Sequence, residues 1–282
     1  MGCFRFCICI YYTNKGNIGM GRWDFYVPND CHEGVNRGIL RSGPQGLERR
    51  CVGMHPGYGI RRLLNPEIFQ GARRKRRYFE GWYIKSIQRN AAPGASPETA
   101  SGVATGDTGL ALIPGVAAGE GGANAHAFLQ LISAGTGWSR WLEFPRDAFS
   151  FRDDRFEVGL DGSRFSSQGV ALSVDRPDIR IDGELAFDRI RPYPKTLFHP
   201  GIMGPYSFVP SMECRHGVVH LSHRVTGEIR VRSADAPDLA FRFPSGEGYI
   251  EKDWGRSFPS RWVWLQANHF EREGLSVMFS IA

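Results

Sequence analysis

The sequence of 282 residues has no long hydrophobic run and no long segment with the period of an amphipathic helix. A helix that crosses a bilayer needs about 20 mostly apolar residues, so no transmembrane helix is expected. Residues 4–12 are too short and too interrupted by polar residues for a signal peptide. These absences predict a cytoplasmic or peripheral membrane protein.

Cysteine is scarce in most of the chain. Five of the six cysteines precede residue 52, and Cys214 is the exception. This excludes a disulfide framework for the body of the protein and is typical of a reducing compartment. On one strand, Cys214, His216 and His220 would share a face, but the outer two lie about 20 Å apart along an extended chain. We therefore expect no metal site there.

Motifs for several common chemistries are also missing. The chain has no GxSxG elbow, which argues against a serine hydrolase. Its glycine-rich stretches, including residues 112–122, lack the following helix that phosphate binding needs. Dinucleotide and nucleotide binding are therefore not expected.

The net charge of +6 is modest, and much of it lies in one basic run. That run consists of Arg73, Arg74, Lys75, Arg76 and Arg77. A solvated loop is the ordinary interpretation of such a run. No second basic cluster or nucleic-acid motif accompanies it, so we expect no nucleic-acid partner. If the run binds a partner, we expect an anionic membrane surface.

The composition favours short strands. With 35 glycines, 17 prolines and 12% aromatic residues, apolar residues come in short runs broken by turn residues. We predict an all-β fold of the sandwich or barrel type. The expected strands cover residues 78–88, 110–113, 127–132, 141–144, 156–160, 170–174 and 179–187.

The chain divides into three parts by composition. Residues 1–53 lack periodicity and are predicted to be a poorly ordered or spurious extension. Residues 54–195 would form a first β half, with a low-complexity loop at 89–108. A proline-rich break at 191–210 forbids regular strand. Residues 196–282 would form a second half that is unfinished, because it ends within an apolar run.

Residues 248–270 form the most unusual segment, GYIEKDWGRSFPSRWVWLQANHF. It places Glu251 and Asp253 near three indoles, those of Trp254, Trp262 and Trp264. If residues 260–270 form a strand, one face carries Trp262, Trp264, Gln266, Asn268 and Phe270, and the other carries Val263, Leu265 and Ala267. The second face is expected in the packed core and the first on the wall of an apolar cavity. Alternatively, the indoles only fill space in a sandwich.

Four carboxyl groups lie in apolar or aromatic strand sequence, where charge is costly: Glu80, Glu213, Glu251 and Asp253. Desolvation by aromatic walls raises the pKa of a carboxyl group, which then serves as a general acid near neutral pH. Alternatively, each acid pairs with a nearby base, namely Lys85, Lys252, Arg215 or Arg256.

Three blocks of the sequence resemble the tocopherol cyclase family. They are RRYFEGWYIKS at 76–86, IMGPYSFVPSMECRHGVVHLSH at 202–223 and the segment 248–270. The resemblance covers residues 54–282 apart from the loop at 89–108. It implies two lipocalin-like or β-sandwich halves around an apolar cavity, as in the related carotenoid hydratases. The family continues beyond residue 282, which again suggests an unfinished second half.

The family resemblance also implies a reaction, the cyclisation of a prenylated hydroquinone to a chromanol, as in vitamin E biosynthesis, with no cofactor. Glu251 would be the general acid. Plant members have Asn at the position of Asp253, so Asp253 would support it. Glu80, Glu213 and His216 would orient the phenol or take up its proton. Residues expected to line the cavity are Trp82, Tyr83, Trp254, Trp262, Trp264 and Gln266.

The alternative function is a lipocalin-like carrier that binds an apolar isoprenoid or lipid without changing it. The two hypotheses differ at Glu251. An enzyme needs this acid buried and facing the ligand, whereas in a carrier it would face solvent or be locked in an ion pair.

Overall fold

The computed structural model of this chain describes residues 57–72, 77–89, 108–134, 136–210, 212–258, 262–268, 270 and 275–281. These ranges lie in one compact unit, Gly57–Ala282. The predictions for residues 1–53, for most of the loop at 89–108 and for the basic residues 73–76 fall outside the described residues.

Almost all of the regular structure is strand, so the predicted all-β fold class is confirmed. The helical elements are α1 (Tyr58–Leu64) and the 3₁₀ turns η1 (Glu120–Gly122), η2 (Arg146–Ala148) and η3 (Gly204–Phe208). No helix within the described ranges is long and apolar enough to cross a membrane.

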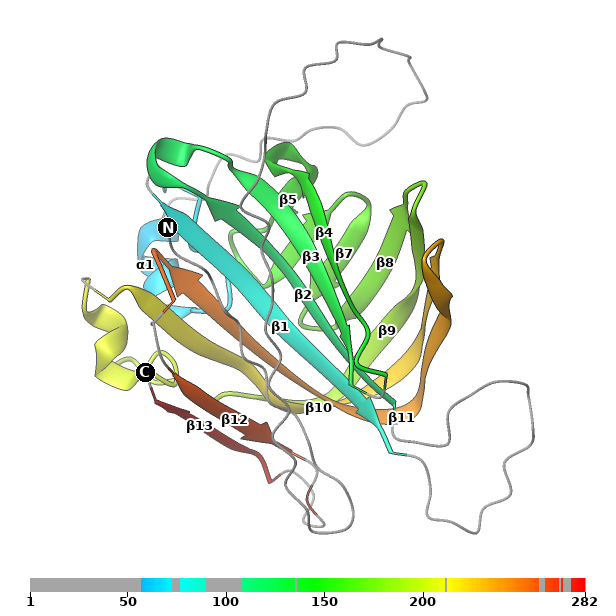
Figure 1. Cartoon of the computed structure of the whole chain (residues 1–282). Helices are drawn as coiled ribbons and strands as arrows, with labels where there is room; N and C mark the ends of the chain where they lie inside the picture. The colour runs from blue at the N-terminus through cyan, green and yellow to red at the C-terminus, as the bar shows by residue number, and fades with distance from the viewer. Residues whose placement is uncertain are drawn as a thin grey trace. The chain divides into compact units, whose positions relative to one another are not determined.

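Eleven strands form one antiparallel sheet in the order β4-β3-β2-β1-β11-β10-β9-β8-β7-β6-β5 (Figure 1). The bounds are β1 (Tyr78–Gln88), β2 (Thr108–Ala118), β3 (His126–Ser133), β4 (Ser139–Pro145), β5 (Phe149–Phe151), β6 (Glu157–Leu160), β7 (Ser163–Ser166), β8 (Gly169–Asp175), β9 (Ile179–Pro192), β10 (Cys214–Ser233) and β11 (Ala236–Gly255). A second sheet pairs β12 (Val263–Ala267) with β13 (Val277–Ile281).

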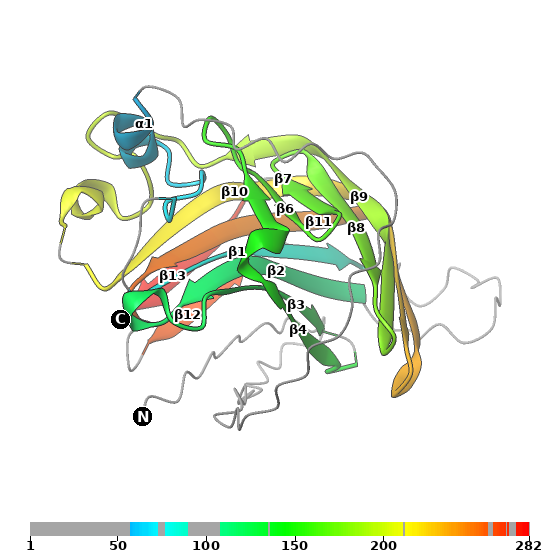
Figure 2. The same ribbon diagram turned by 90° about the horizontal axis from the view of Figure 1, so that it is seen from above.

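The large sheet curls until it is nearly closed (Figure 2). Its two edge strands, β4 and β5, are consecutive in the chain and are joined by the short turn η2. Arg140 on β4 binds Asp178 between β8 and β9, and Asp235 between β10 and β11 at 2.9 Å. These contacts hold the edge strand β4 against the β8–β9 and β10–β11 turns. An edge strand that is covered in this way is protected from pairing with another chain.

The predicted strands agree with β1 to β4, β6, β8 and β9, although several are longer than expected. The proline-rich break is also confirmed, because β9 ends at Pro192 and β10 begins at Cys214. However, β9 and β10 pair directly, so the sheet continues across the boundary expected at residues 195 and 196. The division of the chain into two halves stays a prediction.

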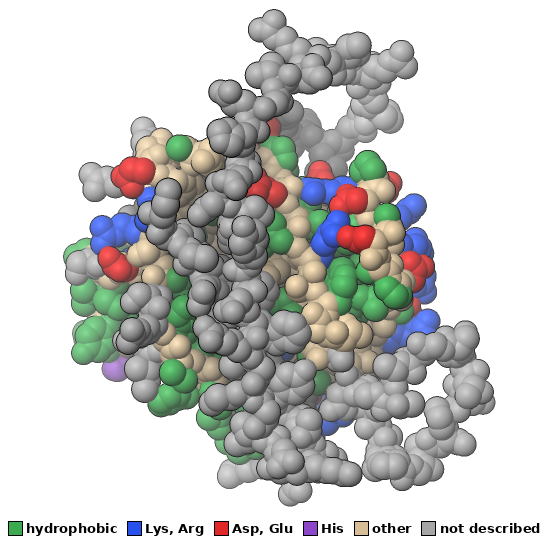
Figure 3. Space-filling model, viewed as in Figure 1, with side chains coloured by type: hydrophobic (Ala, Val, Ile, Leu, Met, Phe, Trp, Pro, Cys, Tyr) green, Lys and Arg blue, Asp and Glu red, His purple; other side chains and the backbone are tan. Residues whose placement is uncertain are grey.

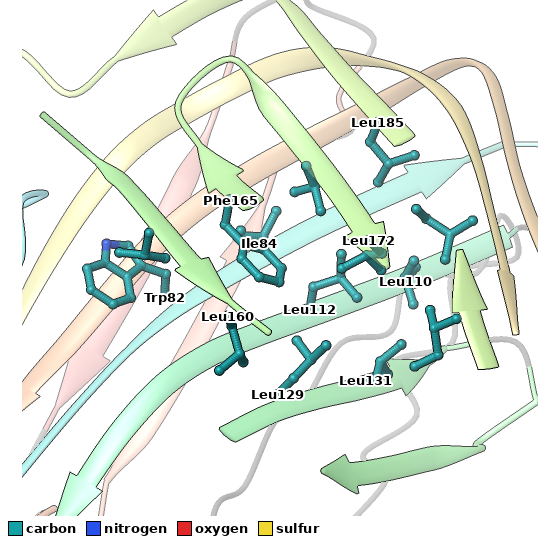
Figure 4. Packing of buried hydrophobic residues seen from close by; sticks show 14 of the residues in the cluster. Trp82, Ile84, Leu110, Leu112, Leu129, Leu131, Leu160, Phe165, Leu172 and Leu185 are labelled. Atoms are coloured by element: carbon teal, nitrogen blue, oxygen red, sulfur yellow. The ribbon is translucent and has the colours of Figure 1, made fainter. Parts of the chain in front are cut away.

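One face of the large sheet, here called the inner face, carries the hydrophobic core (Figure 4). Trp82 and Ile84 of β1 point into it together with Leu112 of β2 and Leu129 of β3. Because successive strand side chains point to opposite faces, the residues between these lie on the other side, here called the outer face.

The outer face of β1 and β11 is covered by β12. The indole of Trp264 packs edge-on against Tyr83, with the ring centres 5.7 Å apart, and Gln266 binds Lys85. The opposite side of β12 was predicted to lie in the packed core. That prediction is wrong for Val263 and Leu265, which are 60% and 51% exposed, because β12 pairs with β13 in a separate two-stranded sheet.

A buried ion pair fixes the segment around α1 against the inner face. Lys252 of β11 lies 2.5 Å from Glu80 of β1, and neither side chain is exposed. Lys252 also donates hydrogen bonds to the carbonyls of Pro66, at 2.9 Å, and Ile68, at 2.5 Å. Glu80 accepts from the backbone N–H of Gln70 at 2.9 and 3.0 Å. Both charges therefore have several partners, as buried charges require.

Replacement Glu80→Gln is expected to lower the free energy of unfolding by about 3 to 5 kcal/mol, because it leaves the Lys252 charge buried without its counter-ion. Urea unfolding followed by circular dichroism measures this. Glu228→Gln, which disrupts the more exposed contact with Arg230, is the control and should cost no more than about 1 kcal/mol. Equal effects of the two variants would contradict the assigned role of the buried pair.

Candidate functional site

The pairing of β1 with β11 separates the predicted site residues into two groups. Tyr83 lies opposite Glu251, whereas Trp82 lies opposite Lys252. Directly opposed residues of an antiparallel pair share a face. Tyr83 and Glu251 are therefore on the outer face, and Trp82 and Lys252 are on the inner face.

Glu251 is the centre of the outer-face cluster. It is 5% exposed, and one carboxylate oxygen, Oε2, accepts two hydrogen bonds. The Tyr249 hydroxyl donates at 2.8 Å and the Trp264 indole N–H at 3.0 Å. Tyr249 precedes Glu251 by two residues and so shares its face of β11, whereas Trp264 reaches down from β12. This arrangement leaves Glu251 Oε1 without a hydrogen bond to either ring.

His216 connects Glu251 to Asp253. His216 lies on β10 opposite Asp253 of β11, and its Nδ1 is 2.9 Å from Asp253 Oδ1. Its Nε2 is 3.4 Å from Glu251 Oε2, which is near enough for an ion pair but not aligned as a hydrogen bond. Asp253 is the most exposed member of the three, so the cluster opens towards solvent on its side.

Burial and neighbouring charges shift the pKa values of this cluster. Burial lowers the pKa of His216, but the charges of Asp253 and Glu251 outweigh that effect and raise it to about 9. Burial raises the pKa of Glu251 to about 7, against the opposing effect of the His216 charge. Near neutral pH, His216 is therefore a cation paired with Asp253, and Glu251 is protonated in a large fraction of the molecules.

A second set of polar contacts ties β12 to the sheet beside this cluster. Lys85 donates hydrogen bonds to Gln266 and, at 3.2 Å, to Asn268 Oδ1. Asn268 in turn donates to the Gly248 carbonyl at 2.8 Å. Burial lowers the pKa of Lys85 to about 8, although Glu251 and Glu247 partly oppose the shift.

Besides His216 Nε2, two buried polar atoms of the outer-face cluster have no hydrogen-bond partner within the described part of the chain. They are the Tyr83 hydroxyl and Gln266 Nε2. Buried polar groups are normally paired, so an unpaired one needs a physical reason. Burial and the Glu251 charge raise the pKa of Tyr83 well above its usual value, so its hydroxyl stays neutral and able to donate. A ligand that offers oxygen acceptors would satisfy both atoms.

The other predicted site residues lie elsewhere. Glu80 and Trp82 are on the inner face, with Trp82 donating to the Glu67 carbonyl at 3.0 Å. Trp254 is also there, because the Lys252 ammonium lies 4.8 Å from its ring centre. Trp262 packs on Phe258. Glu213 is exposed just before β10 and accepts a hydrogen bond from Ser257 at 3.3 Å. The structure brings six of the predicted site residues together: Glu251, Asp253, His216, Tyr83, Trp264 and Gln266. The other five, Glu80, Trp82, Trp254, Trp262 and Glu213, are not part of this group.

The histidines of β10 do not share one face, because the strand has register shifts between Val218 and His220 and again before His223. His220 Nδ1 lies 3.2 Å from His223 Nδ1, and the His223 ring packs on the core residue Phe187. Burial lowers the pKa of His220 to about 4. Cys214, His216 and His220 thus form no common site.

The residues His216, Glu251 and Asp253 form the group of described side chains that could hold a metal ion, since their ligand atoms lie within 4.8 Å of one another. The two ring nitrogens of His216, however, face different carboxylates. A metal ion on either nitrogen would have to displace one of these contacts. The geometry fits a protonated imidazole between two acids better than a metal ligand.

Sequence reasoning missed Tyr249 and Lys85 as site residues, whereas it placed Asn268 on the face of residues 260–270 that was expected to form the cavity wall. The signal for Tyr249 was available, because it precedes Glu251 by two residues on a strand. Lys85 was considered only as an ion-pair partner for an acid, whereas it binds the two amides of β12. Nothing in the sequence says that β12 lies over β1, so the Lys85 contacts required the tertiary structure.

The comparisons with known proteins gave a similar solved structure and a family model. A crystal structure described as a "putative AttH" from Nitrosomonas europaea is similar over 67% of this chain and 56% of that chain, with 12% identity and a TM-score of 0.36. This chain thus matches little more than half the length of that protein. No curated protein is significantly similar. Residues 198–281 match the family model described as tocopherol cyclase-like. This match supports the family resemblance for the part of the chain that carries His216, Glu251 and Asp253.

Proposed function

We propose that this chain catalyses the acid-dependent cyclisation of a prenylated hydroquinone to a chromanol, with Glu251 as the general acid. The observation that carries the proposal is the state of Glu251: it is buried beside an indole and a phenol and has its pKa raised to about 7. A general acid works best when its pKa lies near the operating pH. The tocopherol cyclase-like match supports the substrate class.

In the proposed first step, protonated Glu251 transfers its proton to the trisubstituted alkene of the prenyl tail. A C–H bond forms, the alkene π bond breaks and a tertiary carbocation remains. The resulting Glu251 carboxylate is stabilised by the hydrogen bonds from Tyr249 and Trp264 and by the positive charge of His216. These groups are in place before the reaction, so no reorganisation is needed when the charge develops.

In the second step, the phenol oxygen of the same substrate attacks the cation and closes the ring. The phenol proton returns to Glu251, so the reaction is an isomerisation that regenerates the acid. The rings of Tyr83 and Trp264 lie beside Glu251, and a cation over the face of either ring would be stabilised. Burial under β12 keeps water from adding to it. The Tyr83 hydroxyl and Gln266 Nε2 would bind the oxygens of the quinol ring.

One observation favours the second candidate function, an apolar carrier. His216 Nε2 lies within ion-pair reach of Glu251, which is the locked state expected for a carrier. The stronger contact of His216 is with Asp253, at 2.9 Å. With the imidazolium charge shared in this way, the pKa of Glu251 stays raised to about 7, so Glu251 can hold a transferable proton near neutral pH. This distribution supports the enzyme over the carrier.

Replacement Glu251→Gln is expected to lower turnover of a phytylated or geranylgeranylated benzoquinol by about 100-fold or more, the usual contribution of a general acid. Product analysis by liquid chromatography measures the chromanol. Glu184→Gln changes an exposed carboxylate on β9 and should keep wild-type turnover. Equal turnover by Glu251→Gln and wild type would remove Glu251 from the acid role. Binding of the quinol by the wild type without turnover would establish the carrier.

The rate is expected to depend on pH through Glu251. Because the acid must be protonated, kcat/KM should be maximal below about pH 7 and should fall as the pH rises through the Glu251 pKa. The His216 charge lowers this pKa, so His216→Gln should move the descending limb to higher pH. If the descending limb of the kcat/KM profile stays in place or moves to lower pH in His216→Gln, another group is the acid.

A further inference from the structure

The connection between β9 and β10 presents large apolar side chains to solvent. Phe198 is 74% exposed, Leu197 and Tyr206 are each 66% exposed, and Phe208 is 45% exposed. All four belong to one short stretch of the chain around η3. Single exposed apolar residues are ordinary, but a group of large ones on one segment marks a site of interaction.

This connection is held by its own hydrogen bonds. The backbone N–H of His199 donates to the Thr196 carbonyl at 3.2 Å, and that of Tyr206 donates to the Met203 carbonyl at 3.1 Å. The Arg215 guanidinium fastens the end of the connection by donating to the Val209 carbonyl at 2.6 Å. The apolar side chains are thus carried on a segment with a defined backbone conformation.

The helix α1 extends the same surface. Lys195 donates hydrogen bonds to Asn65 Oδ1 at 3.1 Å and to Glu67 Oε1 at 2.7 Å, which joins the connection to the residues after α1. Two views place α1 and η3 at the same end of the sheet (Figures 1 and 2). On α1, Ile60 and Leu63 are also exposed. We call these six residues the apolar end surface: Ile60, Leu63, Leu197, Phe198, Tyr206 and Phe208.

The charges around the apolar end surface are mostly positive. Residues 189–212 contain Arg189, Arg191 and Lys195 and no acidic residue, and α1 contains two arginines and no acidic residue. Glu67 pairs with Lys195, and the connection ends in one exposed acid, Glu213. Hydrophobic side chains gather at the end of the molecule that carries η3 (Figure 3). Apolar side chains flanked by cations match an anionic lipid surface.

The connection that carries the apolar end surface contacts the strand that holds His216. The backbone N–H of His216 lies 3.2 Å from the Met203 sulfur, which belongs to the connection. A bilayer in contact with Phe198 and Tyr206 would therefore lie next to the strand end that holds His216.

We propose that the apolar end surface docks on anionic lipid bilayers and that this contact delivers apolar ligands to the outer-face cluster. The docking depends on exposed side chains that take no part in the proposed reaction. It holds equally for an enzyme and for a carrier. Failure of cyclisation would leave it standing, and failure of docking would leave the assigned acid unaffected.

Flotation of the purified full chain with vesicles tests the proposal. Phosphatidylcholine vesicles that contain about one third phosphatidylglycerol should bind the chain, and pure phosphatidylcholine should bind it at least about fivefold more weakly. The double variant Leu197→Ser and Phe198→Ser should lower binding to the anionic vesicles about tenfold. Val263→Ser with Leu265→Ser is the matched control, because it removes two exposed apolar side chains from β12.

Two outcomes would count against docking on lipid. Equal loss of binding in the two double variants would show unspecific apolar adsorption and overturn the proposal. Sedimentation velocity of the wild type and the Leu197→Ser, Phe198→Ser variant tests a second copy of the chain as the occupant. A dimer that dissociates in this variant, with vesicle binding unchanged, would also overturn it. Thermal unfolding checks that both variants fold, as expected for exposed positions.

Discussion

The register between β1 and β11 is the constraint on which the rest of the site depends. It places Tyr83 opposite Glu251 and Trp82 opposite Lys252, so neighbouring residues of the same two strands belong to different environments. A shift by one residue would exchange the two faces. Glu251 would then enter the hydrophobic core, together with Tyr249 of the same strand but away from Trp264, and Lys252 would lose Glu80. One backbone alignment thus fixes both the core and the candidate site.

The two buried acids on either side of the sheet illustrate how partners decide the role of a carboxyl group. Glu80 has a full counter-ion in Lys252 and further donors from Gln70 and Tyr78, so it stabilises the fold. Glu251 shares its histidine with Asp253 and is left with a raised pKa. The first arrangement holds a charge in place, whereas the second leaves a proton available for transfer.

The strand β12 contributes to the site from outside the large sheet. Its inward side chains, Trp264, Gln266 and Asn268, meet Glu251, Lys85 and the Gly248 carbonyl. On the far side, Val263 and Leu265 are exposed. The cluster is consequently enclosed between two sheets and opens near Asp253, beside the connection that carries the apolar end surface.

The sequence by itself determined the strand content, the break after β9 and the alternation that turns Trp264, Gln266 and Asn268 to one side, because these follow from local composition and period. Its choice of Glu251 as the acid rests on the family motif and stays a prediction. The sequence could not separate Glu80 and Trp82 from Glu251, since their relative placement depends on which strands pair and in which register. Trp254 could have been separated, because it lies three residues from Glu251 on the same strand and therefore on the opposite face. Nor could the sequence locate His216 between two acids, or Lys85 beneath β12. Only the tertiary structure decided these contacts, because they join residues that are distant in the chain.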